Sequence, residues 1–344
     1  MELGVILGTW NGSRADADDI LRTVQEAERC GYSIVWVPEL YGADAVSVMS
    51  WLAANTRSIR IGSAVMQIPA RAPATTAMTV ASLASLYGER IVLGLGVSGP
   101  QVSEGWYGVP WNDPIGRTRE YIETVKLALS RQRLVYQGKH IQLPGNEDYR
   151  PLKLVLKTQA RVPVYLAAIG PRNIRLAAQI CDGWLPAMVF PERFGALHDQ
   201  FTDALTAAGR KRGDVVIAAS TGAVINADPA AARDVYRPYV TLLIGGMGTR
   251  EQNFYRNLVT GYGYAEIAQE ISELYLAGRI AEAQALTPDE LIDGVGLVGD
   301  EQHVRERLAA YQAADIDIFS IAPAGRTLEE KLAVLRTVAS AAGR

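Results

Sequence analysis

The sequence predicts one (β/α)8 barrel of the TIM type with a helical insertion before its eighth strand. Apolar runs of strand length alternate with longer segments of helical period along the 344 residues, and eight such runs occur. This alternation is typical of β–α units around a parallel sheet. No Pro/Gly/Ser linker or low-complexity tract interrupts the chain, so we expect a single domain over residues 1–344. A doubly wound sheet with a helical second domain is the alternative.

The hydrophobic pattern and the positions of glycine and proline indicate where the predicted elements begin and end. Gly31 ends the first helix as a C-cap, and Pro73 and Pro171 each open a helix at its first turn. The stretch RLVYQGKHIQL alternates around Gln137-Gly138 and predicts a β-hairpin outside the main sheet. The predicted strands are residues 3–7, 33–37, 59–66, 91–96, 164–167, 184–187, 215–224 and 316–321. The predicted helices are residues 18–30, 44–54, 73–86, 116–131, 171–181, 192–208 and 328–341, and a tyrosine-bearing, mostly helical insertion covers about 228–299.

Composition excludes several function classes. The net charge is −3 and there is no basic block, so we expect no binding to nucleic acid. No apolar run approaches the roughly 20 residues that span a bilayer, so we expect no membrane partner. The chain starts as a strand without a basic and apolar leader, and its two cysteines, Cys30 and Cys181, lack metal-ligand spacing. We therefore expect a reduced, cytoplasmic location and no metal.

Residues 94–99 spell G-x-G-x-x-G, the pattern of a dinucleotide-binding turn. That turn requires the first β–α unit, an immediate helix and an acid ending the next strand. Here the motif follows the fourth predicted strand, Glu120 falls inside a helix, and an aromatic loop, EGWYGVPWNDP, comes before the long helix. The sequence therefore disfavours a nicotinamide site. In a barrel, residues 96–99 would lie at the ligand-binding end, where missing side chains let a ring or phosphate approach the backbone. A tight loop without a ligand is the alternative.

A second glycine turn follows the fifth predicted strand. Gly170 ends the run AAIG, Pro171 opens a helix, and Arg172 and Arg175 lie in its first turns. Free backbone N–H groups at a helix N-terminus favour anions. The pattern predicts a phosphate site, and a plain helix start with exposed arginines is the alternative.

Several stretches, in order along nearly the whole chain, resemble the bacterial luciferase-like superfamily, and most closely its branch of oxidoreductases dependent on coenzyme F420. They are YSIVWVPELYG, IRIGSAVMQIPARAP, LYGERIVLGLGVSGPQVSEGWYGVPW, PVYLAAIGPRNIRLAAQICDGWLP and GLVGDEQHVRERL. The resemblance implies a (β/α)8 barrel, usually a homodimer, that binds F420 or, as an alternative, FMN at its mouth. It also implies a cis peptide at Ala64-Val65 behind the ring. Cofactor contacts are implied at Ala64, Val65, Gly96, Val97, Ser98, Gly99, Ile169, Gly170 and Arg172.

The activity implied is hydride transfer from reduced F420 to an electron-poor C=C, C=N or C=O of a small molecule or modified peptide. An FMN-dependent two-component monooxygenase and a non-catalytic cofactor-binding homologue are the alternatives. The chain departs from the sugar-phosphate dehydrogenases of the branch: Leu40 follows Glu39 where they carry a histidine, and Gly99 replaces their glutamate. We expect His140, His198 and His303 to lie on the surface.

Glu39 ends a predicted strand at the catalytic face, so we predict that it donates a proton or orients the cofactor. A salt bridge is the alternative. Trp10, Asn11, Gln67 and Trp184 are predicted to line the substrate pocket because each ends or follows a strand. Glu104 and Trp106, in the family string SEGWYG, are expected either to serve the site or to pin the long loop.

Overall fold

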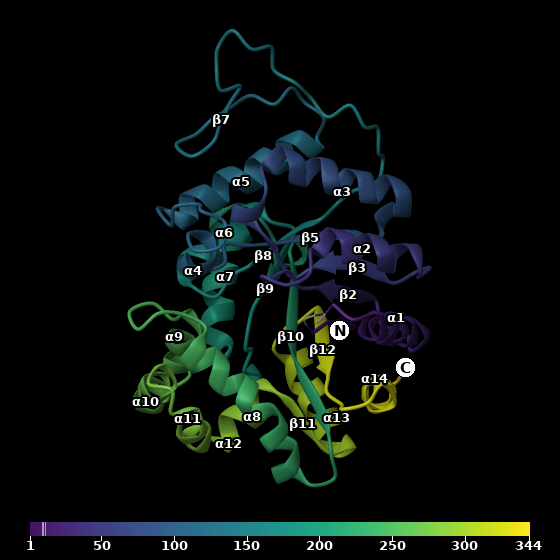
Figure 1. Ribbon diagram of the computed structural model, residues 1–344, viewed down its shortest axis with the longest axis vertical. Coiled ribbons are helices and arrows are strands. Elements are labelled where there is room, and N and C mark those ends of the chain that lie inside the picture. The colour runs from purple at the N-terminus through teal and green to yellow at the C-terminus, as the bar shows by residue number, and fades with distance from the viewer. Residues whose placement is uncertain (9, 11) are drawn as a thin grey trace.

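The fold is a closed parallel barrel (Figure 1). The computed structural model describes residues 1–8, 10 and 12–344. Within them each barrel strand pairs in parallel with the next, and the last pairs with the first. The strands in spatial order are β1 (Glu2–Ile6), β2 (Ile34–Val37), β3 (Arg60–Ser63), β5 (Ile91–Gly96), β8 (Val164–Ala167), β9 (Gly183–Leu185), β10 (Val216–Ile225) and β12 (Ile318–Pro323). The predicted barrel is therefore confirmed, and the doubly wound alternative is wrong.

The helices wrap the outside of the barrel, and polar caps set where several begin. Asp44 caps one helix by accepting from Ser47 N, and Thr327 and Glu330 form a capping box on another. The helices are α1 (Arg14–Arg29), α2 (Ala45–Ala54), α3 (Pro73–Tyr87), α4 (Pro100–Ser103), α5 (Pro114–Leu129), α6 (Pro171–Ile180), α7 (Gly195–Ala207), α13 (Glu301–Ala313) and α14 (Leu328–Ala341). Short 3-10 turns are η1 (Ile68–Ala70), η2 (Gly88–Arg90), η3 (Pro191–Arg193) and η4 (Arg212–Asp214).

The third barrel strand is broken, which corrects the continuous strand predicted over 59–66. β3 ends at Ser63, the Ala64–Val65 peptide is cis, and β4 (Met66–Gln67) resumes by pairing with β5. The helix predicted over 192–208 is likewise divided, because η3 comes first and α7 begins only at Gly195.

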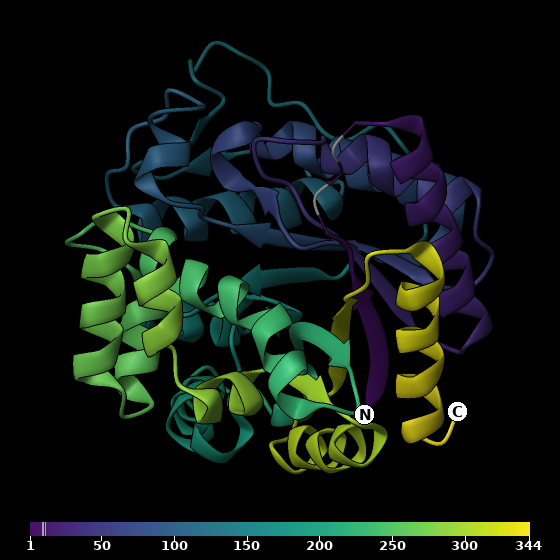
Figure 2. The ribbon, with the colours of Figure 1, turned by 60° about the horizontal axis from the view of Figure 1, so that its bottom comes forward.

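The insertion forms a helical subassembly beside the barrel, with its own apolar core. It contains α8 (Pro229–Gly246), α9 (Phe254–Gly261), α10 (Ala265–Leu276), α11 (Ile280–Leu286), α12 (Asp289–Val295) and a short strand, β11 (Leu297–Gly299), that pairs with β10. Figure 2 shows α9, α10 and α11 standing together at the left edge of the molecule. Its mostly helical character is as predicted.

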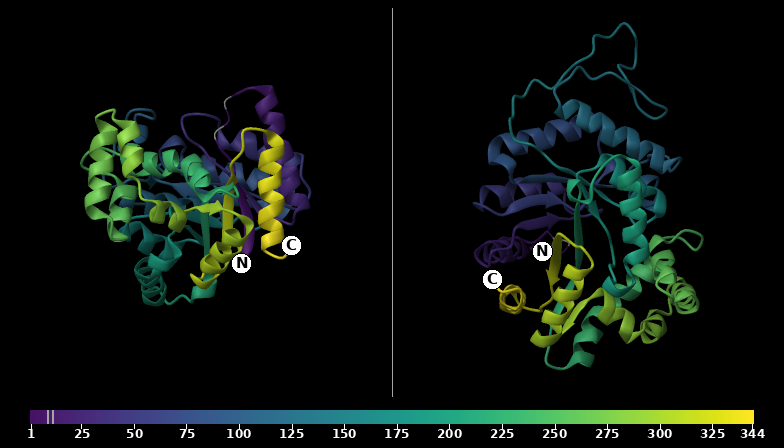
Figure 3. Two further views of the ribbon diagram at one scale, coloured as in Figure 1. Left: turned by 90° about the horizontal axis from the view of Figure 1, so that it is seen from below. Right: turned by 180° about the vertical axis from the view of Figure 1, so that it is seen from behind.

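The predicted hairpin is confirmed as β6 (Tyr136–Gln137) and β7 (Gln142–Leu143), an antiparallel pair outside the barrel sheet. With the loop that follows, it projects beyond α3 and α5 at the end of the molecule opposite the insertion (Figure 3). Among the described residues no helix is long and apolar enough to cross a membrane.

Candidate functional site

The carboxyl ends of the barrel strands meet at one face, where ligands of such barrels bind. The floor of this mouth is apolar. Ile6, Ala64 and Leu185 are partly exposed there and pack on the cluster inside the barrel, which includes Trp36 and Tyr165. An apolar floor of this kind suits a flat, uncharged ring and keeps water from its lower side.

Glycine is required at positions 94 and 96 because the broken third strand passes close to β5 there. A Cβ on Gly94 would lie 1.9 Å from the carbonyl oxygen of Ser63, and one on Gly96 would lie 2.4 Å from Val65 Cγ2. Ser63 Oγ also donates to the Gly94 carbonyl at 2.8 Å. The first two glycines of the G-x-G-x-x-G string thus let the broken third strand pack against β5, and no nicotinamide turn is formed.

Gly99 differs from these two glycines, because a Cβ placed on it would meet nothing within 4 Å. It is the N-cap of α4, and Val97, Ser98 and Gly99 are all partly exposed. Ser98 adopts a φ of 62°, in the left-handed region. This loop therefore leaves room for a ligand beside its backbone.

Glu39 is buried in a network of hydrogen bonds. Its side chain is 4% exposed and receives both terminal nitrogens of Arg71, at 2.6 and 2.7 Å. The backbone N–H groups of Ala45 and Gln67 also donate to it, each at 3.1 Å. The structure thus shows the salt-bridge alternative, in which the Glu39 side chain links the start of α2 to the end of β4. A role in donating a proton or orienting the cofactor stays a prediction.

Arg71 extends this network to the N-cap of α2 by pairing with Asp44. Burial raises the pKa of Asp44, but hydrogen bonds from Ser47 and the Arg71 charge outweigh it and hold the pKa below its usual value. Tyr107 lies close by, and burial together with the negative charge of Glu39 raises the pKa of its phenol.

Gln67 lies at the end of β4 and is 2% exposed. Its Nε2 donates to the Glu39 carbonyl at 2.8 Å, whereas Oε1 is buried without a partner among the described residues. Trp10 is partly exposed, donates from its indole to Ser13 O at 3.0 Å, and lines an apolar pocket between the ends of β1 and β2. Asn11 lies outside the described residues.

The prediction that Trp184 lines the substrate pocket is wrong. Trp184 is 1% exposed, and its ring stacks against Phe194 and Phe201 with centroids 5.5 and 4.7 Å away. Its indole N–H donates to Ala168 O. Side chains alternate along a strand, and Trp184 belongs to the face of β9 that packs under α7.

The turn before α6 has no side-chain cap, and the N–H groups of Asn173 and Ile174 both donate to Gly170 O at 3.0 Å. Gly170 is the N-cap, Pro171 is at the first position, and no side chain caps the turn. A Cβ on Gly170 would meet only Phe254 Cδ1, at 4.0 Å. Asn173, 7% exposed, has Oδ1 without a partner in the described part of the chain. Arg172 is exposed and Ile169 partly exposed. The open helix start and Arg172 fit a bound anion, whereas the Asn173 oxygen is an acceptor and would need a donor instead.

The loop between α4 and α5 is held by Glu104, whose Oε1 accepts from Trp111 N at 2.7 Å. This favours the pinning alternative for Glu104. Trp106 is 62% exposed and contacts Tyr41 of the loop after β2, with ring centroids 6.4 Å apart. The two aromatic rings form a rim on one side of the mouth.

The three histidines lie in the hairpin and in outer helices, but they are not all surface groups. His140 has a side chain 7% exposed and contacts Asp113 Oδ2 at 3.0 Å, while His198 pairs with Asp315 at 2.9 Å. His303 Nε2 is buried and lacks a partner among the described residues. No group of metal-ligating side chains occurs in the described residues.

Sequence reasoning missed two parts of this site, Arg71 and Asn173. Arg71 lies in the stretch IPARAP, directly after the third strand. Its position at the mouth could therefore have been predicted from the sequence. The sequence gave no signal for Asn173, because only the packing shows that its side-chain oxygen is buried without a partner among the described residues.

The model of the family described as "luciferase-like monooxygenase" matches residues 1–317. The chain belongs to this family. A protein of Mycobacterium tuberculosis, assigned by name as a coenzyme F420-dependent oxidoreductase, is 38% identical over 97% of this chain and 99% of its own length. The 5,10-methylenetetrahydromethanopterin reductase of Methanolobus tindarius is 31% identical over 64% of this chain and 65% of its own.

Solved structures of the family share the fold. The coenzyme F420-dependent tetrahydromethanopterin reductase from Methanopyrus kandleri has a TM-score of 0.80 at 21% identity, over 98% of this chain and 97% of that one. An F420-dependent secondary alcohol dehydrogenase in complex with an F420–acetone adduct has a TM-score of 0.77 at 17% identity, over 99% and 98%. These similarities agree with the barrel derived from the strand pairing.

Proposed function

We propose that this luciferase-like protein is an F420-dependent oxidoreductase, and specifically an F420H2-dependent reductase. The observation that carries the proposal is its match, over nearly its whole length, to a relative named for F420 dependence. The direction of the reaction and its acceptor follow from the chemistry of reduced deazaflavin. It donates a hydride, and an electron-poor C=C, C=N or C=O accepts one.

The residues at the mouth suit such a cofactor. Ala64 and Val65, which form the break in the third strand, would lie against one face of the ring, above the apolar floor. Val97, Ser98 and Gly99 would lie along the chain of the cofactor, because space is open at Gly99. Gly170 and the uncapped start of α6 would hold its phosphate, with Ile169 and Arg172 beside it.

When bound, reduced F420 supplies a hydride from C5 of its deazaflavin ring. The protein's own part is to orient that ring and exclude water from it, and the Glu39–Arg71 network does so indirectly by fixing the ends of β2 and β4. A homodimer, a small-molecule or modified-peptide substrate and a cytoplasmic location stay predictions.

A binding titration tests the proposal. Oxidised F420 and, separately, FMN are added to the purified protein while tryptophan fluorescence is followed. We expect F420 to bind in the micromolar range and FMN much more weakly, and F420H2 then to be oxidised by enones or imines. Tighter binding of FMN would favour a flavin monooxygenase, and binding of neither would leave a barrel without a cofactor.

A substitution of Arg172 tests whether the phosphate of the cofactor binds at the start of α6. Arg172→Met should weaken F420 binding about tenfold, since one charge-assisted contact to phosphate is lost. Arg29→Met, at the far end of α1, is the matched control and should bind F420 like the wild type. Equal binding by Arg172→Met and the wild type would place the phosphate elsewhere.

A further inference from the structure

Two neighbouring helices on the outside of the barrel, α2 and α3, carry no charged residue. They pack side by side, with Ser50 Oγ of α2 3.5 Å from Tyr87 Oη of α3. Because 21% of the chain is charged, about five charges would be expected in two helices of 10 and 15 residues. A helix without a charged face is normally buried on all sides. These two helices therefore indicate a surface that another protein covers.

The outer face of α3 shows what this surface presents. Its exposed residues recur at helical spacing and are apolar or weakly polar: Thr75, Met78, Ser82, Ser85 and Leu86. Leu86 is 71% exposed. In α1, another outer helix of similar length, eight of the 16 residues are charged. Contact with water alone therefore does not account for the composition of α3.

A long arm extends from α5, the helix that packs on the other side of α3. The arm is residues 133–160, which include the hairpin β6–β7 and the extended segment after it. Among the described residues, the backbone of residues 153–157 makes no hydrogen bond, and Leu152 and Val155 are 79% and 82% exposed. An extended segment with free N–H and C=O groups and large exposed apolar side chains favours association with another chain.

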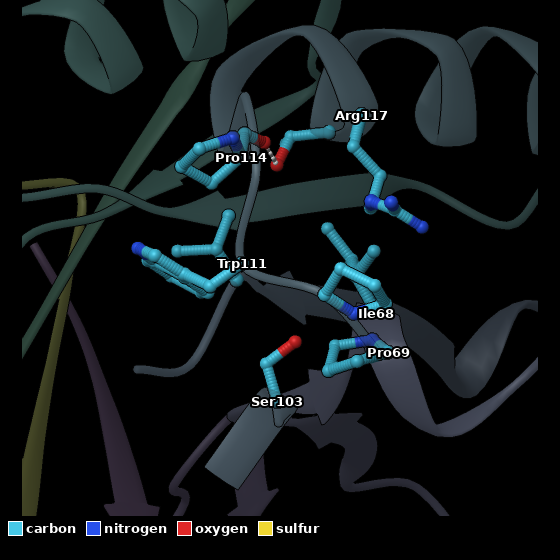
Figure 4. Close-up of a pocket in the computed structure, with 9 residues that line it drawn as sticks. Ile68, Pro69, Ser103, Trp111, Pro114 and Arg117 are labelled. Atoms are coloured by element: carbon cyan, nitrogen blue, oxygen red, sulfur yellow. Dashed lines mark hydrogen bonds between the residues drawn. The ribbon is translucent and has the colours of Figure 1, made fainter. Parts of the chain in front are cut away.

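The base of the arm is held in place by α5. The Glu120 carboxylate accepts the backbone N–H groups of residues 139–141 at 2.7–2.8 Å. α5 itself begins tightly against η1 and α4, since the space left between them has room for about one water molecule (Figure 4). α5 also packs on α3, where the hydroxyls of Thr76 and Tyr121 lie 2.6 Å apart. The arm, α5, α3 and α2 therefore follow one another in one packed layer.

We propose that α2, α3 and the arm form the interface at which two copies of this chain pair about a twofold axis. In such a pair the same face meets itself, and two uncharged helices do so without like-charge repulsion. Taken from the helix lengths, a spacing of about 10 Å between packed helices and the extended residues 151–160, the face covers about 700 Å². A standard stable interface uses about 800 Å² of each partner. The face is therefore large enough for a dimer.

A second copy suits this face better than a protein of another sequence. Different partners are selected largely by complementary charge, and α2 and α3 offer none, whereas a second copy supplies an identical uncharged face. At its border, Lys153 and Lys157 of the arm and Glu89 after α3 form no ion pair in the described part of the chain, so both signs are free for contacts between copies.

The inference is independent of the proposed function, because neither F420 nor a turnover enters it. The family resemblance implies a homodimer but names no residue that forms it. The uncharged helices and the arm of this chain assign the face.

Analytical ultracentrifugation of the full chain tests the proposal, with circular dichroism as the check on folding. We expect the wild type to sediment at twice the mass of one chain at micromolar concentration. Met78→Glu and Val155→Glu should each raise the dissociation constant of the dimer at least tenfold, because the twofold axis buries each new charge twice. Val235→Glu, on α8 of the insertion, is the matched control at a position as exposed as Met78 and should stay dimeric.

Cross-linking keeps the test decisive if a glutamate variant does not fold. In a Cys30→Ser background, Ser82→Cys on the outer face of α3 should give a covalent dimer with a bismaleimide, whereas Val235→Cys should not. A wild type of single-chain mass would overturn the proposal. So would a dimer that neither Met78→Glu nor Val155→Glu weakens, or equal cross-linking through the two introduced cysteines.

Discussion

At the scale of single residues, the chemistry of the mouth depends on how each polar group is held. Glu39 has the sequence position of a catalytic acid, yet its carboxylate is occupied by Arg71 and two backbone N–H groups. Its side chain links the start of α2 to the end of β4, and its backbone carbonyl accepts from Gln67 Nε2. A buried ion pair adds little net stability while it is intact, because desolvation offsets the attraction, but removing one partner leaves an uncompensated charge.

Removing Arg71 should therefore destabilise the fold more than removing an exposed arginine. We expect Arg71→Met to lower the free energy of unfolding by about 3 kcal/mol, because the Glu39 side chain is only 4% exposed and loses its cation. Urea denaturation followed by circular dichroism measures the free energy of unfolding of each variant. The control Arg305→Met breaks an exposed pair with Glu301 on α13, and should cost less than about 1 kcal/mol. Equal losses in the two variants would contradict the positioning role.

At the scale of elements, the junction of the third strand with β5 shapes the site. β3 stops at Ser63, the chain bulges through Ala64 and Val65, and β4 rejoins the sheet beside β5. The bulge fits only because two positions on β5 have no side chain. The same string of glycines thus contains two that are needed for packing and a third, Gly99, that leaves open space.

Alanine substitutions separate these two kinds of glycine. Gly94→Ala should lower the free energy of unfolding by about 3 kcal/mol, because its Cβ would overlap the Ser63 carbonyl oxygen. Gly99→Ala should change stability by less than about 0.5 kcal/mol, since its Cβ meets nothing within 4 Å and its φ of −129° suits alanine. Thermal and urea unfolding measure both. A stable Gly94→Ala variant would show that the bulge can move away from β5.

At the scale of the whole molecule, the barrel and the insertion are two packed units with separate apolar cores. Arg193 of η3 connects them, lying over the rings of Phe190 and Tyr264 and pairing with Glu290 of α12. Buried tyrosines occur in both units. Inside the barrel and under α3, burial raises the pKa of Tyr165 and of Tyr121 to about 12 in each case.

These tyrosines predict a loss of stability in alkali. A tyrosine with a raised pKa in the fold leaves stability intact below its unfolded value of 10.0, and stability then falls as the pH rises toward about 12. Between pH 10 and 12, each such tyrosine lowers the free energy of unfolding by about 1.4 kcal/mol per pH unit. Tyr121→Phe removes one group and should make the decline of the urea midpoint between pH 10 and 12 shallower. An unchanged decline would contradict the burial of this phenol.

The architecture and the family could both be predicted from local patterns in the sequence. Alternating apolar runs gave the eight barrel strands their order, and the glycine and proline positions located the turns before α4 and α6. Strand boundaries were predicted to within a few residues because local hydrophobic period specifies them. The insertion and the hairpin were visible for the same reason.

The contacts of individual side chains could not be predicted in this way. Trp184 lies in β9 and Glu39 follows β2, but Trp184 packs under α7, whereas Glu39 is enclosed by Arg71. The break in the third strand and the need for glycine at position 94 likewise depend on segments distant in sequence. A local pattern places a residue at the end of a strand, but burial and hydrogen-bond partners arise from contacts between elements, which no local pattern contains.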